Sequence, residues 1–449
     1  AALLEAGARA ENLTESQFGL ASIEPRWNLS GTYQQVVPRY FSTDANGGDE
    51  QDFLTPWFDS MSQMATAIFL KGYQWPFDHD KASNHGSSLI DILVQDETLR
   101  KGRRVFLDFR ENPRAGQHMT SFTPDGLAPE ALEYLQKSGA LQPTPIERLA
   151  HSNPLSIDLY KQRGVDLAAT PLEIEVCAQH CNGGFSVDRW WESNVRHLFV
   201  IGELAGTHGV KRPGGAALNA GQVGGLRAAQ RIAHVYYGQN LSLKLFTEIA
   251  RDTVGHWVGE MARLKSPAPR AGGASDLRHS IQRRMNRHAG MVRCLDGVHQ
   301  ALAEAEAEWK ELMKKGLCPG EAGLLEAIET REIALTQRAF LEALRALLER
   351  DGGSRGSYLV TAPHGTLPHP ALDDFWRFVP ENTALRNEIL SLFYCGDTDS
   401  FQTGTGSPRP FPSTEAWFEN TWADCREGRI FAERDGDAPV PSLPPRFLA

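Results

Sequence analysis

Charged side chains that could hold an anionic ligand stand among closely spaced glycines near the middle of the chain. Glu203, His208, Lys211 and Arg212 fall within this stretch. Its glycines are Gly202, Gly206, Gly209, Gly214, Gly215, Gly221, Gly224 and Gly225. Glycine lacks the Cβ atom that keeps a backbone away from a ligand, and an arginine can bind a carboxylate through two parallel hydrogen bonds. The pattern favours a ligand-binding loop over a surface loop that is rich in glycine by chance.

The segments on either side of this loop read as a strand and a helix. Leu198 to Ile201 is an apolar run with the length of a buried strand. After the loop, apolar residues recur at helical spacing: Leu226, Ala229, Ile232, Ala233 and Tyr236. A helix N-terminus offers free N–H groups and a partial positive charge to an anion. The loop fits neither the G-x-x-x-x-G-K-[ST] pattern nor the dinucleotide fingerprint.

The stretch from His197 to Gly238 resembles the C-terminal flavin-binding segment of the succinate dehydrogenase, fumarate reductase and L-aspartate oxidase flavoprotein family. In that family a strand ends in Gly-Glu, and a loop of the form H-G-x-x-R-x-G-G then leads into a helix. The corresponding residues here are Gly202 and Glu203, followed by HGVKRPGG at 208–215. The resemblance implies an FAD-dependent oxidoreductase.

The same resemblance implies a set of site residues. Arg212 and His208 would hold a substrate carboxylate. The expected cofactor-binding residues are Gly202, Glu203, Arg212, Gly214, Gly215, Ala217 and Leu218. A second segment adds His180, which precedes the pair Gly183-Gly184, as a substrate-contacting histidine does in the family. One residue fewer separates the two here, and a simple turn histidine is the alternative. The expected catalytic residues are therefore His180, His208 and Arg212.

The composition excludes several classes of protein. The 449 residues are 41% hydrophobic and 23% charged, and the net charge of −10 argues against nucleic acid or an anionic membrane as partner. No apolar run reaches the roughly 18 residues of a transmembrane helix. Six cysteines in this length do not form a disulfide framework, and Cys177 and Cys181 have no second pair, so no metal is expected. The cytoplasm is the expected compartment.

The resemblance also divides the chain. It implies an incomplete α/β flavin-binding domain (1–20 and 171–240), an inserted α+β substrate-capping domain (21–170) and a C-terminal helical bundle (241–356). Residues 357–449 read as a loop-rich extension. The chain contains no G-x-G-x-x-G after a strand, so the N-terminal dinucleotide-binding part is expected on a companion polypeptide, unless the chain is a fragment.

Several elements follow from periodicity. Residues 14–23 and 103–110 read as strands, and the spacing of Met61, Met64 and Ile68 predicts a helix. Leu172, Ile174 and Val176 alternate as in a further strand. Two long helical stretches are predicted from Ile281 to Leu312 and from Leu324 to Leu347.

Two expected catalytic groups of the family have no counterpart here. The family places a histidine after a Gln-Phe pair, but Gln17 and Phe18 are followed by Gly19. The family also places a proton-donating arginine in a helix of the cap, where the nearest cation in this chain is Lys71. Residues 78–80 (Asp-His-Asp) form either a polar cluster or, as the sequence favours, a solvated loop.

Two functions remain open at this stage. The first is a flavoenzyme, or the catalytic part of one, that transfers a hydride between FAD and a small anionic substrate. The second is a non-catalytic subunit that keeps the fold and binds a partner chain. The sequence does not give the substrate or the electron acceptor.

Overall fold

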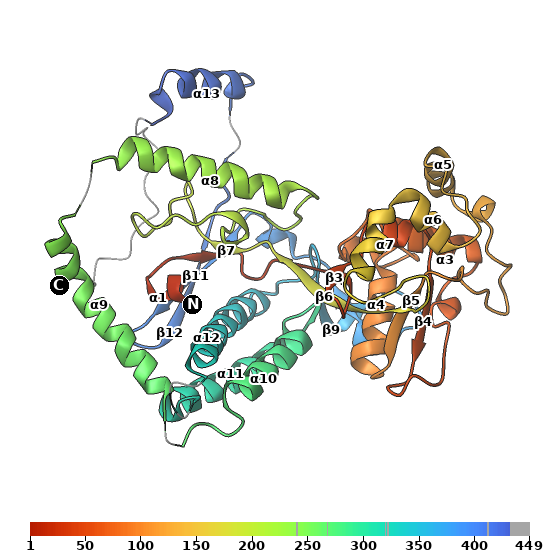
Figure 1. Ribbon diagram of the computed structural model, residues 1–449, viewed down its shortest axis with the longest axis horizontal. Helices are drawn as coiled ribbons and strands as arrows, with labels where there is room; N and C mark the ends of the chain where they lie inside the picture. Colours follow the sequence, from red (N-terminus) through yellow and green to blue (C-terminus); the bar gives the residue numbers. More distant parts are fainter. Residues whose placement is uncertain (239–240, 267, 319, 321–322, 411–412, 432–449) are drawn as a thin grey trace.

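A computed structural model of the chain describes residues 1–449 except 239–240, 267, 319, 321–322, 411–412 and 432–449. Figure 1 shows two bodies side by side, joined where β6 (Leu172–Cys181) passes from one to the other. Within the described residues, no helix is both long enough and apolar enough to cross a bilayer.

The first body contains a five-stranded antiparallel sheet. Its order is β3 (Trp27–Asn28), β2 (Ser16–Ser22), β6, β5 (Arg104–Asp108) and β4 (Arg39–Thr43). Helices cover it: α2 (Thr32–Gln35), α3 (Met61–Leu70), α4 (Leu89–Gln95), α5 (Pro129–Lys137), α6 (Pro145–Ser152) and α7 (Pro154–Lys161). The predicted strands at 14–23, 103–110 and 172–176 and the predicted helix around Met64 are confirmed.

The second body is built around a four-stranded sheet and three long helices. The sheet order is β12 (Ser400–Gly406), β11 (Ile389–Cys395), β1 (Ala10–Glu11) and β7 (Gly184–Phe185). The helices are α10 (Gly273–His288), α11 (Leu295–Lys315) and α12 (Leu324–Leu348), and α1 (Ala2–Glu5) lies against β11. Their apolar faces form one core that includes Leu277, Val298, Leu312, Leu335 and Leu344.

The helical prediction from Ile281 to Leu312 is wrong in one respect, because two helices occupy this stretch. A Cβ atom at Gly290 would stand 2.6 Å from the carbonyl oxygen of Asn286, which marks a tight turn after α10. The chain then enters β8 (Val292–Arg293), which pairs in parallel with β9 (Leu359–Thr366). The pairing with β9, a long-range contact that periodicity does not reveal, breaks the helix. The second prediction is confirmed by α12.

The C-terminal stretch has more regular structure than its composition suggests. Besides β9 it contains β10 (Phe378–Val379), the hairpin of β11 and β12, and α13 (Trp417–Arg426). The part of the predicted extension at 411–412 and 432–449 lies outside the described residues.

The strand predicted at Leu198–Ile201 does not form. Phe199 makes one isolated bridge with Glu192, and the N–H of Val200 donates to the carbonyl of Trp191. Ile201 is exposed. A strand needs a neighbouring strand for its backbone hydrogen bonds, and this run finds only its own preceding turn among the described residues. The helix after the glycine loop is confirmed as α8 (Ala216–Val235), and α9 (Leu243–Leu264) follows it.

Candidate functional site

The glycine loop opens directly in front of α8. The backbone is left-handed at Gly202 (φ 68°), Gly209 (φ 64°) and Gly215 (φ 78°). Gly215 is the N-cap residue of α8, and no side chain caps that end. Ideal Cβ atoms at Gly202, Gly209, Gly214 and Gly215 would meet nothing within 4 Å. The loop therefore leaves open space beside its backbone and beside the N–H groups of the first helical turn, which have no partner within the helix.

Glu203 links this loop to the end of β6. Its Oε1 atom accepts a hydrogen bond of 2.8 Å from the backbone N–H of Cys181, and its Oε2 atom lies 3.6 Å from Nε2 of His180. The Glu203 side chain is nonetheless 53% exposed. The Glu203 carboxylate is thus fixed by the backbone of Cys181 at the edge of the site, and about half of the side chain remains accessible to solvent or to a ligand.

His180 and His208 face each other with ring centroids 4.8 Å apart. Nδ1–H of His180 donates to Oδ1 of Asn182 at 3.1 Å, which leaves Nε2 as the acceptor nitrogen of the neutral ring. Asn182 also donates from Nδ2 to the carbonyl of Val210, so one asparagine orients the histidine and the loop. Sequence reasoning did not find Asn182.

Burial lowers the pKa of both histidines. For His180 burial is the main cause, and the Glu203 carboxylate opposes it. For His208 burial comes first, and the neighbouring His180 and Arg212 lower the pKa further. Nε2 of His180 and both ring nitrogens of His208 are buried without a hydrogen-bond partner among the described residues. Buried polar atoms are normally paired, so a ligand that reached these nitrogens would satisfy them.

Arg212 is fixed by Gln17 of β2. Its Nε donates to Oε1 of Gln17 at 3.0 Å, and Nε2 of Gln17 donates to the Arg212 carbonyl at 3.1 Å. Nη1 donates to the carbonyl of Pro213. These partners are neutral, and burial lowers the pKa of Arg212. A guanidinium that desolvation penalises and whose bonds run to neutral groups is suited to binding an anion.

Lys211 joins the loop to residues 78–80 of the first body. Its Nζ lies 2.9 Å from Oδ1 of Asp78 and 2.7 Å from Oδ2 of Asp80. His79 Nε2 lies 3.1 Å from Oδ1 of Asp80. Residues 78–80 therefore form a polar cluster, although the sequence favoured a solvated loop. Lys211 pairs with both carboxylates of the cluster.

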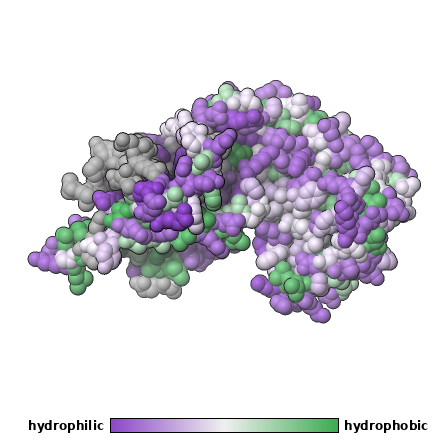
Figure 2. All heavy atoms as spheres, turned by 90° about the horizontal axis from the view of Figure 1, so that it is seen from above, coloured by the Kyte–Doolittle hydropathy of each residue, from purple (hydrophilic) through white to green (hydrophobic). Residues whose placement is uncertain are grey.

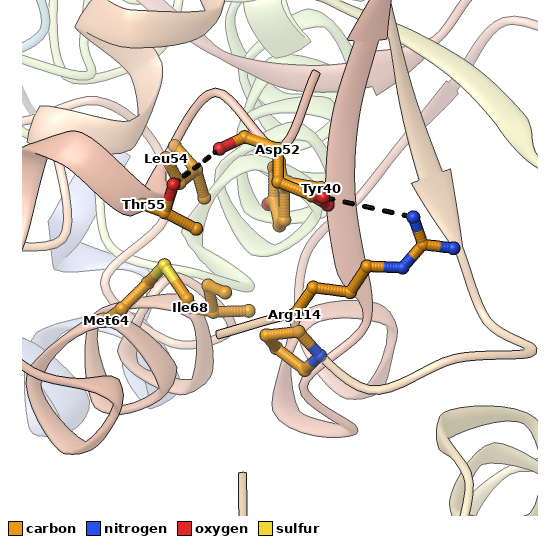
Figure 3. A pocket seen from close by; sticks show the side chains of 8 residues that line it. Tyr40, Asp52, Leu54, Thr55, Met64, Ile68 and Arg114 are labelled. Carbon is orange, nitrogen blue, oxygen red and sulfur yellow. Dashed lines mark hydrogen bonds and ion pairs between the residues drawn. The ribbon is translucent and has the colours of Figure 1, made fainter. Parts of the chain in front are cut away.

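A pocket of about 130 Å³ lies between these elements. The loop, β2 and the turn after Ser354 contribute Gln17, Val210, Lys211, Arg212, Gly356 and Ser357. The segment after α3 contributes Tyr73, Gln74, Trp75, Pro76, Phe77, Asp78 and Lys81. A second pocket, within the first body and shown in Figure 3, has about 10 Å³ beside Tyr40, Asp52 and Arg114, which is room for a single water.

Trp75 covers the position where the family's histidine was expected. A Cβ atom at Gly19 would stand 2.6 Å from Nε1 of the Trp75 indole. The ring therefore occupies the space that a side chain at Gly19 would need. Sequence reasoning noticed the missing histidine but not the tryptophan that takes its space, since the two are far apart in the chain.

Two further cations are structural. Lys71, the nearest cation to the family's proton donor, is fully buried and pairs with the equally buried Asp91 at 2.6 Å. Arg355 pairs with the buried Glu15 at 2.6 Å. Neither Lys71 nor Arg355 lines the 130 Å³ pocket.

No protein-family model matches the chain. Among curated proteins, a subunit of the fumarate reductase (CoM/CoB) of Methanothermobacter marburgensis is 28% identical over 200 residues, 43% of this chain and 34% of that protein. Chloroplastic L-aspartate oxidase of Arabidopsis thaliana is 26% identical over 220 residues, 47% of this chain and 32% of that protein. The chain thus matches about a third of the length of these relatives.

Among solved structures, the FrdA chain of E. coli quinol fumarate reductase superimposes with a TM-score of 0.57 at 15% identity. The superposition covers 92% of this chain and 62% of that one. At this identity the match establishes the fold, and 38% of the FrdA chain (100% minus 62%) lies outside the superposition.

Proposed function

We propose that this chain, which belongs to the succinate dehydrogenase, fumarate reductase and L-aspartate oxidase flavoprotein family, is the substrate-binding part of an FAD-dependent oxidoreductase. The observation that carries the proposal is the meeting of Glu203, His180, His208 and Arg212 beside the open N-terminus of α8. The end of β6 supplies His180 and the glycine loop supplies the other three groups, and the loop leaves the space beside several of its glycines open.

FAD, when bound, would supply hydride chemistry at its isoalloxazine ring. The chain's residues fit it through the glycine backbone at Gly202, Gly214 and Gly215, the carboxylate of Glu203, and the first turn of α8 at Ala217 and Leu218. Leu218 is 77% exposed, so this turn is open to a ligand or a protein surface. Arg212, which the resemblance also placed with the cofactor, would hold the anionic group of the substrate.

The two histidines define where a proton can be held. With Nδ1–H committed to Asn182, Nε2 of neutral His180 is free to accept a proton or a hydrogen bond. His208 packs on this ring and keeps water from one side of it. The lowered pKa of both rings keeps them neutral at physiological pH, as an acceptor requires.

We propose further that a protein part carrying a dinucleotide-binding fold covers an apolar face on this chain. The face comprises Ile201, Leu204, Leu218, Val223, Leu226 and Ile232, all exposed. Figure 2 shows apolar residues at the surface of the left half of the molecule, the half that holds α8 and α9 in Figure 1, and further ones at the surface of the right half. Large apolar surfaces that a soluble protein leaves exposed mark sites of interaction with another protein surface. A protein part that corresponds to the 38% of the FrdA chain outside the superposition is the proposed cover of this apolar face.

A second function is favoured by one observation. Trp75 fills the space beside Gly19, so no acid–base group can stand there. A non-catalytic subunit that keeps the fold and binds a partner chain would have no need of one. The buried, unpartnered nitrogens of His180 and His208 favour the enzyme instead.

Native mass spectrometry of the protein from its source, with an absorbance spectrum, tests both proposals. A mass increment equal to FAD and a companion polypeptide support the split flavoenzyme. Glu203→Gln should reduce flavin content, and Leu226→Asp should release the companion, whereas Leu155→Asp on the exposed cap surface should do neither. Intact flavin with no turnover of any anion would support the non-catalytic subunit. A chain without flavin in every preparation would overturn the flavoenzyme.

A further inference from the structure

The 130 Å³ pocket has one aromatic wall and one cationic wall. Tyr73, Trp75 and Pro76 come from a single short segment of the cap and form the apolar side. Arg212 faces the pocket from the glycine loop. The two walls differ in chemistry, so a ligand that fits both carries an anionic group at one end and an apolar body at the other.

Trp75 is held in this wall by packing. Its Nε1 is buried and donates to no acceptor among the described residues. The ring lies over Gly19, two residues along β2 from Gln17, the residue that fixes Arg212. The indole and the Arg212 guanidinium both line the pocket, and β2 positions both of them, the indole through Gly19 and the guanidinium through Gln17.

Arg212 is the cation of the pocket that we assign to the anionic group of the ligand. Lys211 is already paired with Asp78 and Asp80. Arg212 is bonded only to neutral groups in the contacts the structure gives it. Lys81 also lines the pocket, so a dicarboxylate held between Arg212 and Lys81 is the competing arrangement.

The pocket has room for about one aromatic ring. An apolar cavity of about 150 Å³ in another protein holds benzene, so the ring of a larger ligand would fill most of this pocket of about 130 Å³ and its remaining atoms would lie at the wall formed by Arg212. Aromatic pairs in offset or edge-to-face contact contribute more than their area alone.

We propose that the pocket selects an aromatic monocarboxylate, and that Trp75 is the residue that determines this selectivity. The proposal rests on the function proposed above, since Arg212 is the anion-binding residue in both. The carboxylate binds Arg212, and the ring of the ligand packs on the indole of Trp75 and on Tyr73. Gly19 is required because any side chain there would displace the indole.

The test is isothermal titration calorimetry of the full chain with cinnamate and with fumarate. We expect cinnamate to bind more tightly than fumarate. Trp75→Ala should weaken cinnamate binding by about three- to tenfold and leave fumarate binding unchanged. Trp75→Phe keeps an aromatic face and should stay within about twofold of the wild type. Trp27→Ala, an exposed cap tryptophan outside the pocket lining, is the matched control.

Far-ultraviolet circular dichroism checks that each variant folds, and Tyr73→Ala repeats the test on the same wall should Trp75→Ala not fold. Fumarate binding that is tighter than cinnamate binding, or cinnamate binding indifferent to Trp75 and Tyr73, would overturn the proposal. Calorimetry does not depend on flavin, so the two proposals fail separately. A chain that binds cinnamate through Trp75 but never carries flavin supports this inference and overturns the oxidoreductase.

Discussion

Nε2 of His180 lies 3.6 Å from Oε2 of Glu203, and this contact joins the end of β6 to the glycine loop. The histidine is buried, while the carboxylate is half-exposed. Burial lowers the pKa of His180 and the carboxylate opposes that effect, so the protonation of the ring depends on a residue that the cofactor is proposed to contact.

Replacing Glu203 by glutamine should lower the pKa of His180 further. The substitution removes the charge that favours the imidazolium and keeps an oxygen that can accept from the N–H of Cys181. Nuclear magnetic resonance titration of the histidine ring protons measures the shift. Glu175→Gln, on the same strand, is the control. A pKa that stays constant or rises in Glu203→Gln would show that the carboxylate does not act on the ring.

The stability of the chain should fall as the pH drops below about 6.5. The folded-state pKa values of His180 and His208 are lowered, so at mildly acidic pH the unfolded chain binds protons that the folded chain does not. The stabilisation is complete above the unfolded-state pKa and is lost as the pH falls toward the folded-state values. Urea unfolding at about pH 7.5 and about pH 5.5 measures it, and His180→Asn should reduce the difference. An unchanged difference in that variant argues against the lowered pKa.

Removing one partner of the buried Lys71–Asp91 pair should destabilise the first body strongly. Both side chains are fully buried, and burial raises the pKa of Asp91. Lys71→Met leaves a buried carboxylate unpaired, which costs about 3–5 kcal/mol in free energy of unfolding. The double variant Lys71→Met/Asp91→Leu should recover most of that loss. Denaturant unfolding of the three proteins measures both effects. Equal stability of the single variant and the wild type would contradict a structural role for Lys71.

Alanine substitution should affect two glycines near the site in different ways, lowering stability at Gly183 and flavin content at Gly214. A Cβ atom at Gly183 would stand 1.9 Å from the carbonyl oxygen of Asn12, whereas one at Gly214 would meet nothing within 4 Å. Gly183→Ala should therefore lower the free energy of unfolding by about 2 kcal/mol or more. Gly214→Ala should leave stability unchanged and reduce flavin content, because the open space beside it is proposed to receive the cofactor. Thermal unfolding and flavin absorbance separate the two effects. A Gly214→Ala protein with full flavin would remove that residue from the proposed site.

Local patterns predicted much of the scaffold. The alternation at Leu172, Ile174 and Val176 identified β6, and the spacing of Met61, Met64 and Ile68 identified α3. These elements follow from a period that one face of a sheet or helix imposes on its own residues. The run at Leu198–Ile201 had the right composition for a strand but lacks a partner strand among the described residues, which no local pattern reveals.

The candidate site was predictable where the sequence carries the family's motifs, in the glycine loop and at His180. Residues 202–215 form one continuous loop, and the sequence identified its charged members. Gln17, Asn182 and Trp75 reach the site from other segments, and their contacts with Arg212, Val210 and Gly19 depend on tertiary packing. The break between α10 and α11 has the same origin, because β8 pairs with a strand more than sixty residues later in the chain, Val292 with Leu359.

The short strand β1 has a consequence for synthesis of the protein. Ala10 pairs with Phe185 on one side and with Leu392 on the other. The ribosome releases Ala10 before either partner, and the second partner emerges some 380 residues later, as the difference between 392 and 10 shows. Long-range pairing of this kind is slow to form, and chains of this size fold through intermediates. The five-stranded sheet of the first body, which is complete by Cys181, can fold during translation, while β1 stays unpaired on one edge until β11 appears.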